Sequence, residues 1–333
     1  MVGAAFFSVG GAFSSVGAAF LSVGDTLCLV ERPIDHVPFA WQDLEEITAA
    51  FERLGLTPEY GGVHDNGVTH MSVLGFDDQT YVELIAERAD GDHDFWPAQI
   101  RADAGPAAWC VRVPDIVAEC EHVLRSGRPV QGPYYGSRER ADGRLVEWDR
   151  AVFGDEASRL RLPFAIEDRT PLSYRVTPSP SVAGGPLTGI EQVVIAVTDL
   201  DTATRQFREL YRYPQPVVQS VSPFGTVASF PGEPVALAIP DEDDDWLSER
   251  LAAFPDSPCA VLLGTESPDD DTESPDDDTE STGDTDGLAA ARESFPLRES
   301  QSWPTGHVAF FDSDLLGHRL GVLDRGPVRT TAT

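Results

Sequence analysis

The pattern of hydrophobic and polar positions along residues 34 to 87 predicts one strand, one helix and three further strands. Residues 34 to 40 form a short apolar run of the kind that favours a strand. Apolar residues then recur with the 3, 4, 7 spacing of an amphipathic helix, at Leu44, Ile47, Ala50, Phe51 and Leu54. Gly55 ends this helix, turn signals divide residues 60 to 74, and residues 79 to 86 alternate as a strand does. The segment is therefore predicted to be one β-α-β-β-β unit.

Weaker copies of this pattern follow along the chain. The second covers residues 107 to 168, the third begins at residues 189 to 197, and a degenerate fourth includes an apolar run at 259 to 263. Four such units would form two paired domains joined by a Pro/Ser/Gly-rich linker. The predicted boundaries are an apolar tract at 1–32, a first domain at 33–176, a linker at 177–187, and a second domain at 188–326 with an acidic insertion at 265–286.

Short motifs inside the first unit resemble a known family. They are Asp35-His36-Val37, Leu54-Gly55-Leu56, Gly62-x-His64 and Tyr81-Val82-Glu83-Leu84. Together they are similar to the glyoxalase-like branch of the vicinal oxygen chelate superfamily. Arg140-Ala141-Asp142-Gly143 and Pro163-Phe164 resemble the second half of the same family. The resemblance implies an α+β fold, in which repeated β-α-β-β-β units pair into cupped mixed sheets around a divalent metal or a small ligand.

The resemblance also implies candidate metal ligands on the first and last strands of each unit. These are His36 and Glu83 in the first unit, with Gln192 at the position of His36 in the third. An imidazole nitrogen and carboxylate oxygens suit one divalent ion of manganese, iron, nickel or zinc. Glu83 is also the candidate catalytic base. In the second unit the corresponding positions fall near residues 109–110 and 165–167, and they offer no clear second pair of ligands.

Further polar and aromatic residues are candidates for substrate binding. His64 and His70 flank a turn, and two interpretations stay open for them: either one completes the set of metal ligands, or both are polar loop histidines near the ligand cup that hydrogen-bond a substrate or nothing. Trp109, Tyr134 and Arg140 belong to an aromatic and arginine-rich second unit suited to grip an aromatic or anionic molecule. Core packing explains the tryptophan equally well, whereas the pair Tyr134-Tyr135 beside glycine and proline is typical of a binding loop.

The charge composition changes the expected environment and partners. All 24 basic residues are arginines, because the chain has no lysine, and they face 56 acidic residues for a formal net charge of −32. Such a surface suits a concentrated salt medium in which charges are screened, so we expect a halophilic source. The absence of clustered basic residues argues against nucleic acid as a partner. A small-molecule ligand is the expected partner, and an oligomer remains open.

Two low-complexity tracts repeat every seven residues. The apolar tract of residues 3 to 23 has the length of a membrane span, but it lacks the basic flank of a signal or anchor. We therefore expect a cytoplasmic protein for which a membrane partner is unlikely, with an N-terminal membrane anchor as the alternative. The acidic tract of residues 265 to 278 has no apolar residue to bury, which predicts a disordered insertion.

Two functions remain open from the sequence. In the first, the chain is a metal-dependent lyase, isomerase or dioxygenase that chelates the oxygens of a small substrate. In the second, it is a metal-free protein of the same fold that binds a small oxygen-rich or aromatic molecule without catalysis. The number of ligand-capable residues on the first and last strands discriminates between them, and the sequence offers only part of a full set.

Overall fold

The computed structural model describes residues 32–140, 142–241, 245–265 and 285–325. All of the described residues belong to one compact unit, within residues 32–333. The predictions for the N-terminal tract and for most of the acidic insertion therefore lie outside the described residues. Within the described part, no helix is long and apolar enough to cross a membrane.

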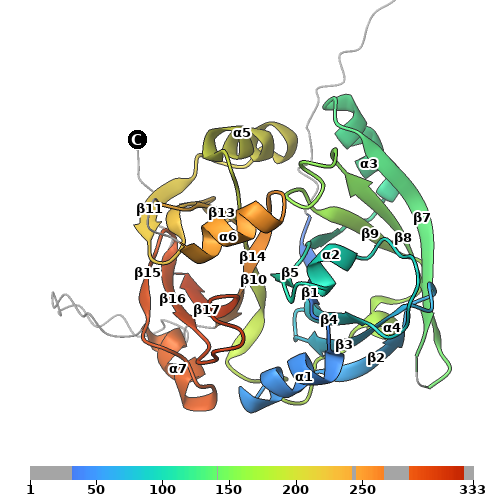
Figure 1. The fold of residues 1–333 in the computed structure, drawn as a ribbon, viewed down its shortest axis with the longest axis horizontal. Helices are drawn as coiled ribbons and strands as arrows, with labels where there is room; N and C mark the ends of the chain where they lie inside the picture. The colour runs from blue at the N-terminus through green and yellow to red at the C-terminus, as the bar shows by residue number, and fades with distance from the viewer. Residues whose placement is uncertain (1–31, 141, 242–244, 266–284, 326–333) are drawn as a thin grey trace, which may run out of the picture. The chain divides into compact units, whose positions relative to one another are not determined.

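The first half of the described chain forms one mixed sheet with the order β2-β3-β4-β1-β6-β9-β8-β7, and β5 pairs with the end of β1 (Figure 1). Its strands are β1 (Ile34–Ala40), β2 (Glu59–Val63), β3 (Thr69–Gly75), β4 (Tyr81–Glu87), β5 (Gly105–Pro106), β6 (Cys110–Arg112), β7 (Val130–Glu139), β8 (Leu145–Phe153) and β9 (Phe164–Asp168). Its helices are α1 (Leu44–Arg53), α2 (Pro97–Ile100), α3 (Ile116–Arg125) and α4 (Leu172–Arg175).

Strand direction divides this sheet into two similar units. β1 pairs parallel with β4, and β6 pairs parallel with β9, so each unit brings its first strand beside its last. A parallel pair needs a long crossover, which α1 with β2–β3 and α3 with β7–β8 provide. The two units meet where β1 pairs antiparallel with β6. This arrangement confirms the predicted fold class of paired β-α-β-β-β units.

The second half repeats the arrangement with the order β11-β12-β13-β10-β14-β17-β16-β15. Its strands are β10 (Leu187–Ala196), β11 (Val217–Val221), β12 (Gly225–Ser229), β13 (Val235–Ile239), β14 (Ser257–Thr265), β15 (Gln301–Trp303), β16 (Gly306–Phe310) and β17 (Leu320–Arg325). Its helices are α5 (Leu200–Tyr211), α6 (Asp245–Ala253) and α7 (Asp286–Ser294). Again the first and last strands pair in parallel, β10 with β13 and β14 with β17.

The crossover helix α1 shows why the predicted elements form where they do. Asp43 caps its start, because the carboxylate accepts from the backbone N–H groups of Glu45 and Glu46. Such a cap contributes about 1 kcal/mol of stability. The apolar stripe of the helix, which includes Ile47 and Phe51, is fully buried against the sheet. Local capping and amphipathic spacing thus fix the helix in the predicted place.

Apolar and polar contacts join the two halves of the described chain. A continuous apolar cluster includes Val37 and Trp109 of the first half and Phe207 of the second, and the rings of Trp109 and Phe207 lie 6.3 Å apart. The buried guanidinium of Arg250 on α6 donates to the carbonyl oxygen of Ala104 in the first half at 2.6 Å. Because polar and apolar contacts both join the halves, residues from α6 can take part in a site on the first sheet.

Candidate functional site

A cavity lies against the face of the first sheet that bears His36 and Glu83, a face we call the first cup. Its volume is about 340 Å³, which is within the range of small-molecule sites. Its aromatic walls come from Phe95, Trp96, Trp148 and Phe164. Residues 253–255, at the end of α6 and directly after it, line one side. The cavity therefore combines a mainly apolar wall with a small group of buried ionisable residues.

A β-bulge on β1 places two ionisable residues together. Ile34 pairs with Val111 and His36 pairs with Cys110, so Asp35 is an extra residue in the ladder. In a regular strand adjacent side chains would point to opposite faces, whereas a bulge re-aims one of them. Here Asp35 Oδ1 lies 2.6 Å from His36 Nδ1, and both residues are buried. The bulge therefore gives the histidine a carboxylate partner from its own strand.

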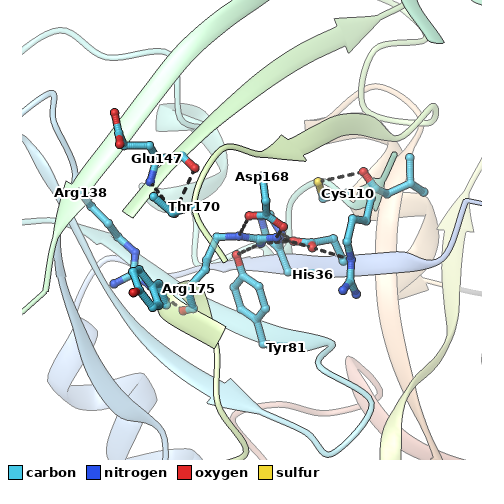
Figure 2. A network of polar contacts seen from close by, with 12 residues as sticks. His36, Tyr81, Cys110, Arg138, Glu147, Asp168, Thr170 and Arg175 are labelled. Atoms are coloured by element: carbon cyan, nitrogen blue, oxygen red, sulfur yellow. Dashed lines mark hydrogen bonds and ion pairs between the residues drawn. The ribbon is translucent and has the colours of Figure 1, made fainter. Parts of the chain in front are cut away.

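A buried guanidinium holds this carboxylate in its ionised form. Arg175, the last residue of α4, donates Nη2 to Asp35 Oδ2 at 2.7 Å and Nε to Asp168 Oδ1 at 2.9 Å (Figure 2). It also donates Nη1 to the Tyr81 hydroxyl at 3.1 Å. Burial opposes the charge of Asp35, but Arg175 and the bond from His36 nevertheless lower the pKa of that carboxyl below its ordinary value. Asp35 therefore accepts the Nδ1 proton of His36.

The opposite nitrogen of His36 faces a second carboxylate. His36 Nε2 lies 3.4 Å from Glu83 Oε2, and the imidazole is stacked on the ring of Tyr81 at a centroid distance of 4.6 Å. Tyr81 and Glu83 point to the same side because they are two residues apart on β4. The stacking and the bond to Asp35 together fix the orientation of the imidazole.

A second imidazole approaches the other oxygen of Glu83. His64 Nε2 lies 3.2 Å from Glu83 Oε1, while His64 Nδ1 lies 2.8 Å from Thr69 Oγ1. The Thr69 hydroxyl donates to Asn66 Oδ1 at 3.2 Å and accepts from Asn66 Nδ2 at 3.0 Å, which leaves one acceptor position on its oxygen for His64 Nδ1. Burial opposes ionisation of Glu83, yet His64 and His36 lower the pKa of this carboxyl. One buried carboxylate thus lies between two imidazole Nε2 atoms.

The structure brings together three of the sequence-predicted site residues, His36, His64 and Glu83, and all three line the first cup. Gln192 lies instead on β10 of the second sheet, where it donates to Ser229 Oγ and accepts from Trp303 Nε1, each at 2.8 Å. It is therefore not placed to complete a ligand set with His36 and Glu83.

The remaining predicted substrate-binding residues lie outside the cavity. Trp109 is fully buried in the core and donates to the carbonyl oxygen of Arg161. His70 packs at the edge of Tyr60, with ring centroids 6.1 Å apart. Arg140 lines a smaller cavity of about 190 Å³ and donates to the carbonyl oxygen of Tyr174 at 2.8 Å.

Tyr134 was expected in a binding loop and lies instead on strand β7, where its side chain is about half exposed. A bulge between Gln131 and Tyr134 accommodates the intervening Gly132-Pro133 without ending the strand. Tyr134 touches the site only indirectly, because the guanidinium of the cavity-lining Arg150 lies 5.8 Å from its ring centroid. The turn-like composition therefore marked an irregular strand rather than a loop.

Several site residues were missed by the sequence analysis. Asp35 stands beside His36 in the same apolar run, but only the bulge turns its side chain to the histidine. Arg175 lines the cavity from α4, and no spacing in the sequence relates it to β1, whereas Arg138 on β7 belongs to the arginine-rich second unit that the sequence marked for binding. The detectable signal was Asp35, as a charged residue in an otherwise apolar strand.

The second unit contributes apolar side chains at the positions that correspond to the ligands. The cavity is lined there by Ala108 before β6 and by Phe164 and Ile166 on β9. His36 and Glu83 occupy the equivalent strands of the first unit, so the ligand-capable residues in the cavity are asymmetric.

A different trio also brings potential metal ligands close together. Ligand atoms of Asp35, His36 and Cys110 lie within 4.8 Å of one another. However, Asp35 is already bonded to Arg175, and burial raises the pKa of the Cys110 thiol well above its ordinary value. A neutral thiol and a carboxylate held by a guanidinium are poor ligands for a cation. In the first cup, the Nε2 atoms of His36 and His64 lie 3.4 and 3.2 Å from opposite oxygens of Glu83.

Solved structures with the same architecture define the class of fold. A hypothetical protein from Staphylococcus aureus aligns with a TM-score of 0.52 at 14% identity, covering 71% of this chain and 92% of its own. A mutant of 4-hydroxymandelate synthase from Streptomyces coelicolor aligns with a TM-score of 0.52 at 12% identity, covering 90% and 94%. A xylose isomerase-like TIM barrel/4-hydroxyphenylpyruvate dioxygenase fusion protein gives 0.51 at 13% identity, covering 90% and 49%. The paired, curled mixed sheets are those of the vicinal oxygen chelate fold.

A family comparison narrows this class. The model of the glyoxalase-like domain family matches residues 34–211, which is more than half of the chain. The chain therefore belongs to the glyoxalase-like domain family. No curated protein matches its sequence.

Proposed function

We propose that this chain is an enzyme that acts on a small oxygen-rich molecule in the first cup, with His36, His64 and Glu83 as ligands of one divalent metal. The observation that carries the proposal is the pair of Nε2 atoms at 3.2 and 3.4 Å from the two oxygens of Glu83. Each imidazole has its Nδ1 hydrogen-bonded to another residue, so each directs Nε2 toward the carboxylate.

The electrostatics of this arrangement support a cation between the three side chains. A neutral imidazole that donates from Nδ1 presents a lone pair at Nε2, and a lone pair beside a carboxylate oxygen is unfavourable without a proton or metal ion between them. Ligating histidines usually donate their other nitrogen to a carboxylate or similar acceptor, as His36 does to Asp35. Two histidines and one carboxylate are also a known ligand set for ferrous iron with open positions for substrate.

The chain's own residues then have distinct tasks in the reaction. A bound divalent metal would supply Lewis-acid polarisation of substrate oxygens. Asp35 and Tyr81 hold the His36 ring in place, and Arg175 keeps Asp35 ionised. Glu83 is the carboxylate that would take a substrate proton, through an oxygen that is not bound to the metal. The aromatic walls exclude water from the site of this proton transfer, and electrostatic interactions are stronger where water is excluded.

A metal-free binding protein is the second candidate, and one observation favours it. The cavity positions of the second unit are Ala108, Phe164 and Ile166, so the two units together do not provide a symmetric ligand set. In that case His36 and His64 would hold protons between themselves and Glu83, and the cup would bind its ligand by shape and polarity.

Metal content separates the two candidates. We would measure it for the native chain and for His36→Ala, His64→Ala and Glu83→Ala, each purified without chelators. About one equivalent of metal in the native chain, lost in all three variants, is the expected result. His70→Ala is the matched control, because this histidine lies on the neighbouring strand but does not line the cavity. If the native chain holds no metal after incubation with Mn²⁺, Fe²⁺, Ni²⁺ and Zn²⁺, the metal-dependent enzyme is rejected and the metal-free binding protein is favoured.

A further inference from the structure

Arg138 is a buried cation that the proposed chemistry does not use. It lies on β7, is only 6% exposed and lines the cavity of the first cup. Its Nη1 donates to the carbonyl oxygen of Gly61 at 2.6 Å and its Nη2 to that of Arg175 at 2.7 Å. Both acceptors are neutral. Among the described residues, no carboxylate lies within 4.0 Å of its guanidinium nitrogens to form an ion pair.

Two other arginines at this cavity have carboxylate partners, in contrast to Arg138. Arg175 bonds to Asp35 and to Asp168, and Arg150 donates to Asp94 Oδ2 at 2.6 Å. Burial lowers the pKa of the Arg138 guanidinium below its ordinary value. A buried charge without a counter-ion is costly, and the cost falls when an anion binds beside it.

Glu83 attracts Arg138 through space but forms no ion pair with it. Its two oxygens face His36 and His64, at 3.4 and 3.2 Å. A divalent cation held by these side chains would add positive charge to the cavity. The electrostatics of the cup therefore favour a ligand that brings its own negative charge.

We infer that Arg138 binds an anionic group of the substrate, a carboxylate in the simplest case, and that the substrate is an organic acid with an apolar or aromatic body. A guanidinium has five N–H donors in a planar fork that matches a carboxylate, and the described bonds of Arg138 use two of them. The ring walls of Trp96, Trp148 and Phe164 suit the apolar body. This inference rests on the proposed function for the location of the substrate in the first cup.

The test compares four acids with their uncharged amides at neutral pH. The probes are benzoate, phenylacetate, 3-phenylpropanoate and 4-phenylbutanoate, which place a carboxylate at increasing distance from one ring. Binding is measured by calorimetry for the native chain, Arg138→Gln and Arg138→Lys. We expect the native chain to prefer at least one acid over its amide by about tenfold to 100-fold, as for a hydrogen bond to a charged group. Arg138→Gln should abolish the preference, and Arg138→Lys should retain part of it.

A matched control separates the site from general charge. Arg169→Gln removes an exposed arginine that pairs with Asp149 outside the cavity, and it should keep the native preference. Near-ultraviolet circular dichroism checks that each variant is folded, because Arg138 also joins β2 to α4. If Arg138→Gln does not fold, Arg138→Lys provides the test. Complete loss of binding to the preferred acid in a folded Arg138→Lys variant would contradict a site based on charge.

The same samples keep this inference apart from the proposed metal site. An acid preference that Arg138→Gln removes supports the inference even if the native chain holds no metal, in which case the metal proposal alone fails. Metal that depends on His36, His64 and Glu83, together with no preference for any acid, would overturn the anion site alone. A preference that persists in folded Arg138→Gln would also overturn it.

Discussion

The two sheets have equivalent strand orders, but their corresponding faces carry different side chains. The first cup holds a cavity with His36, Glu83 and a set of buried charges. The second cup, the face of the second sheet that bears Gln192, is packed by aromatic rings, with Phe224 lying 5.6 Å from Trp303 and 5.5 Å from Phe310. One fold therefore supports a polar site in one half and an apolar core in the other, which shows why fold alone does not fix function.

The strand register makes this comparison residue by residue. In the first sheet, Pro38 pairs with Glu83, and His36 lies two residues before Pro38. In the second, Val194 pairs with Ala236, and Gln192 lies two residues before Val194. Gln192 thus corresponds to His36, and Ala236 corresponds to Glu83. The second cup has a neutral amide and a methyl group where the first has an imidazole and a carboxylate.

The largest effect is expected when the carboxylate of the first cup is copied into the second. Ala236→Glu would bury an anion among apolar side chains, because Ala236 is fully buried in the aromatic-lined cluster. We expect a loss of about 5 kcal/mol in the free energy of unfolding, from an unpaired buried charge and overpacking. Urea unfolding at pH 7 measures it. Ala236→Val is the control for size, and an equal loss in both variants would show that charge is not the cause.

The next largest effect tests the charges of the first cup. Arg175→Met would leave Asp35 and Asp168 without their shared guanidinium, at a cost of about 4 kcal/mol at pH 7. The depressed pKa of Asp35 stabilises the native chain above the ordinary pKa of an aspartate, and this stability is lost as pH falls. The difference between native and variant should therefore shrink as the pH is lowered below about 4.

Urea unfolding of both chains at pH 7 and at acid pH checks this prediction. Arg169→Met provides the control, because it removes an exposed arginine from an ion pair with Asp149 and should cost less than about 1 kcal/mol. A difference between native and Arg175→Met that stayed constant with pH would mean that the ionisation of Asp35 does not contribute.

A smaller effect is expected from the polar pair of the second cup. Gln192 accepts from Trp303 Nε1 and donates to Ser229 Oγ. Gln192→Leu would leave the buried indole N–H without its acceptor, at a cost of about 2 kcal/mol in the free energy of unfolding. Thermal unfolding of this variant and of Gln192→Glu, which keeps an acceptor but introduces a charge, measures the cost. If Gln192→Leu is as stable as the native chain, the amide has no structural task in the second cup.

Sequence and structure agree best where a signal is local. The α1 helix was predicted from its apolar spacing and Gly55, and Glu83 was found on the expected last strand. The site was harder to predict because it depends on register and on distant segments. A bulge turns Asp35 toward His36, and Arg175, which bonds to Asp35, is 140 residues away from it in the sequence. The asymmetry of the second unit was visible in its residues, whereas the filling of the second cup by Phe224 depends on tertiary packing.

The smallest stability effect should come from the residue that matters most to the proposed function. Glu83→Gln keeps the shape of the side chain and offers an N–H to an imidazole Nε2, so the apo protein should lose less than about 1 kcal/mol in the free energy of unfolding. This change should be a loss of stability rather than a gain, because the lowered pKa of Glu83 means that its surroundings favour the ionised carboxylate over a neutral group. The same substitution should remove metal, because the amide supplies no anionic ligand. A folded, equally stable Glu83→Gln protein that retains its metal would show that this carboxylate is not a metal ligand. The first cup would then resemble the second, because neither would have an anionic ligand at this strand position.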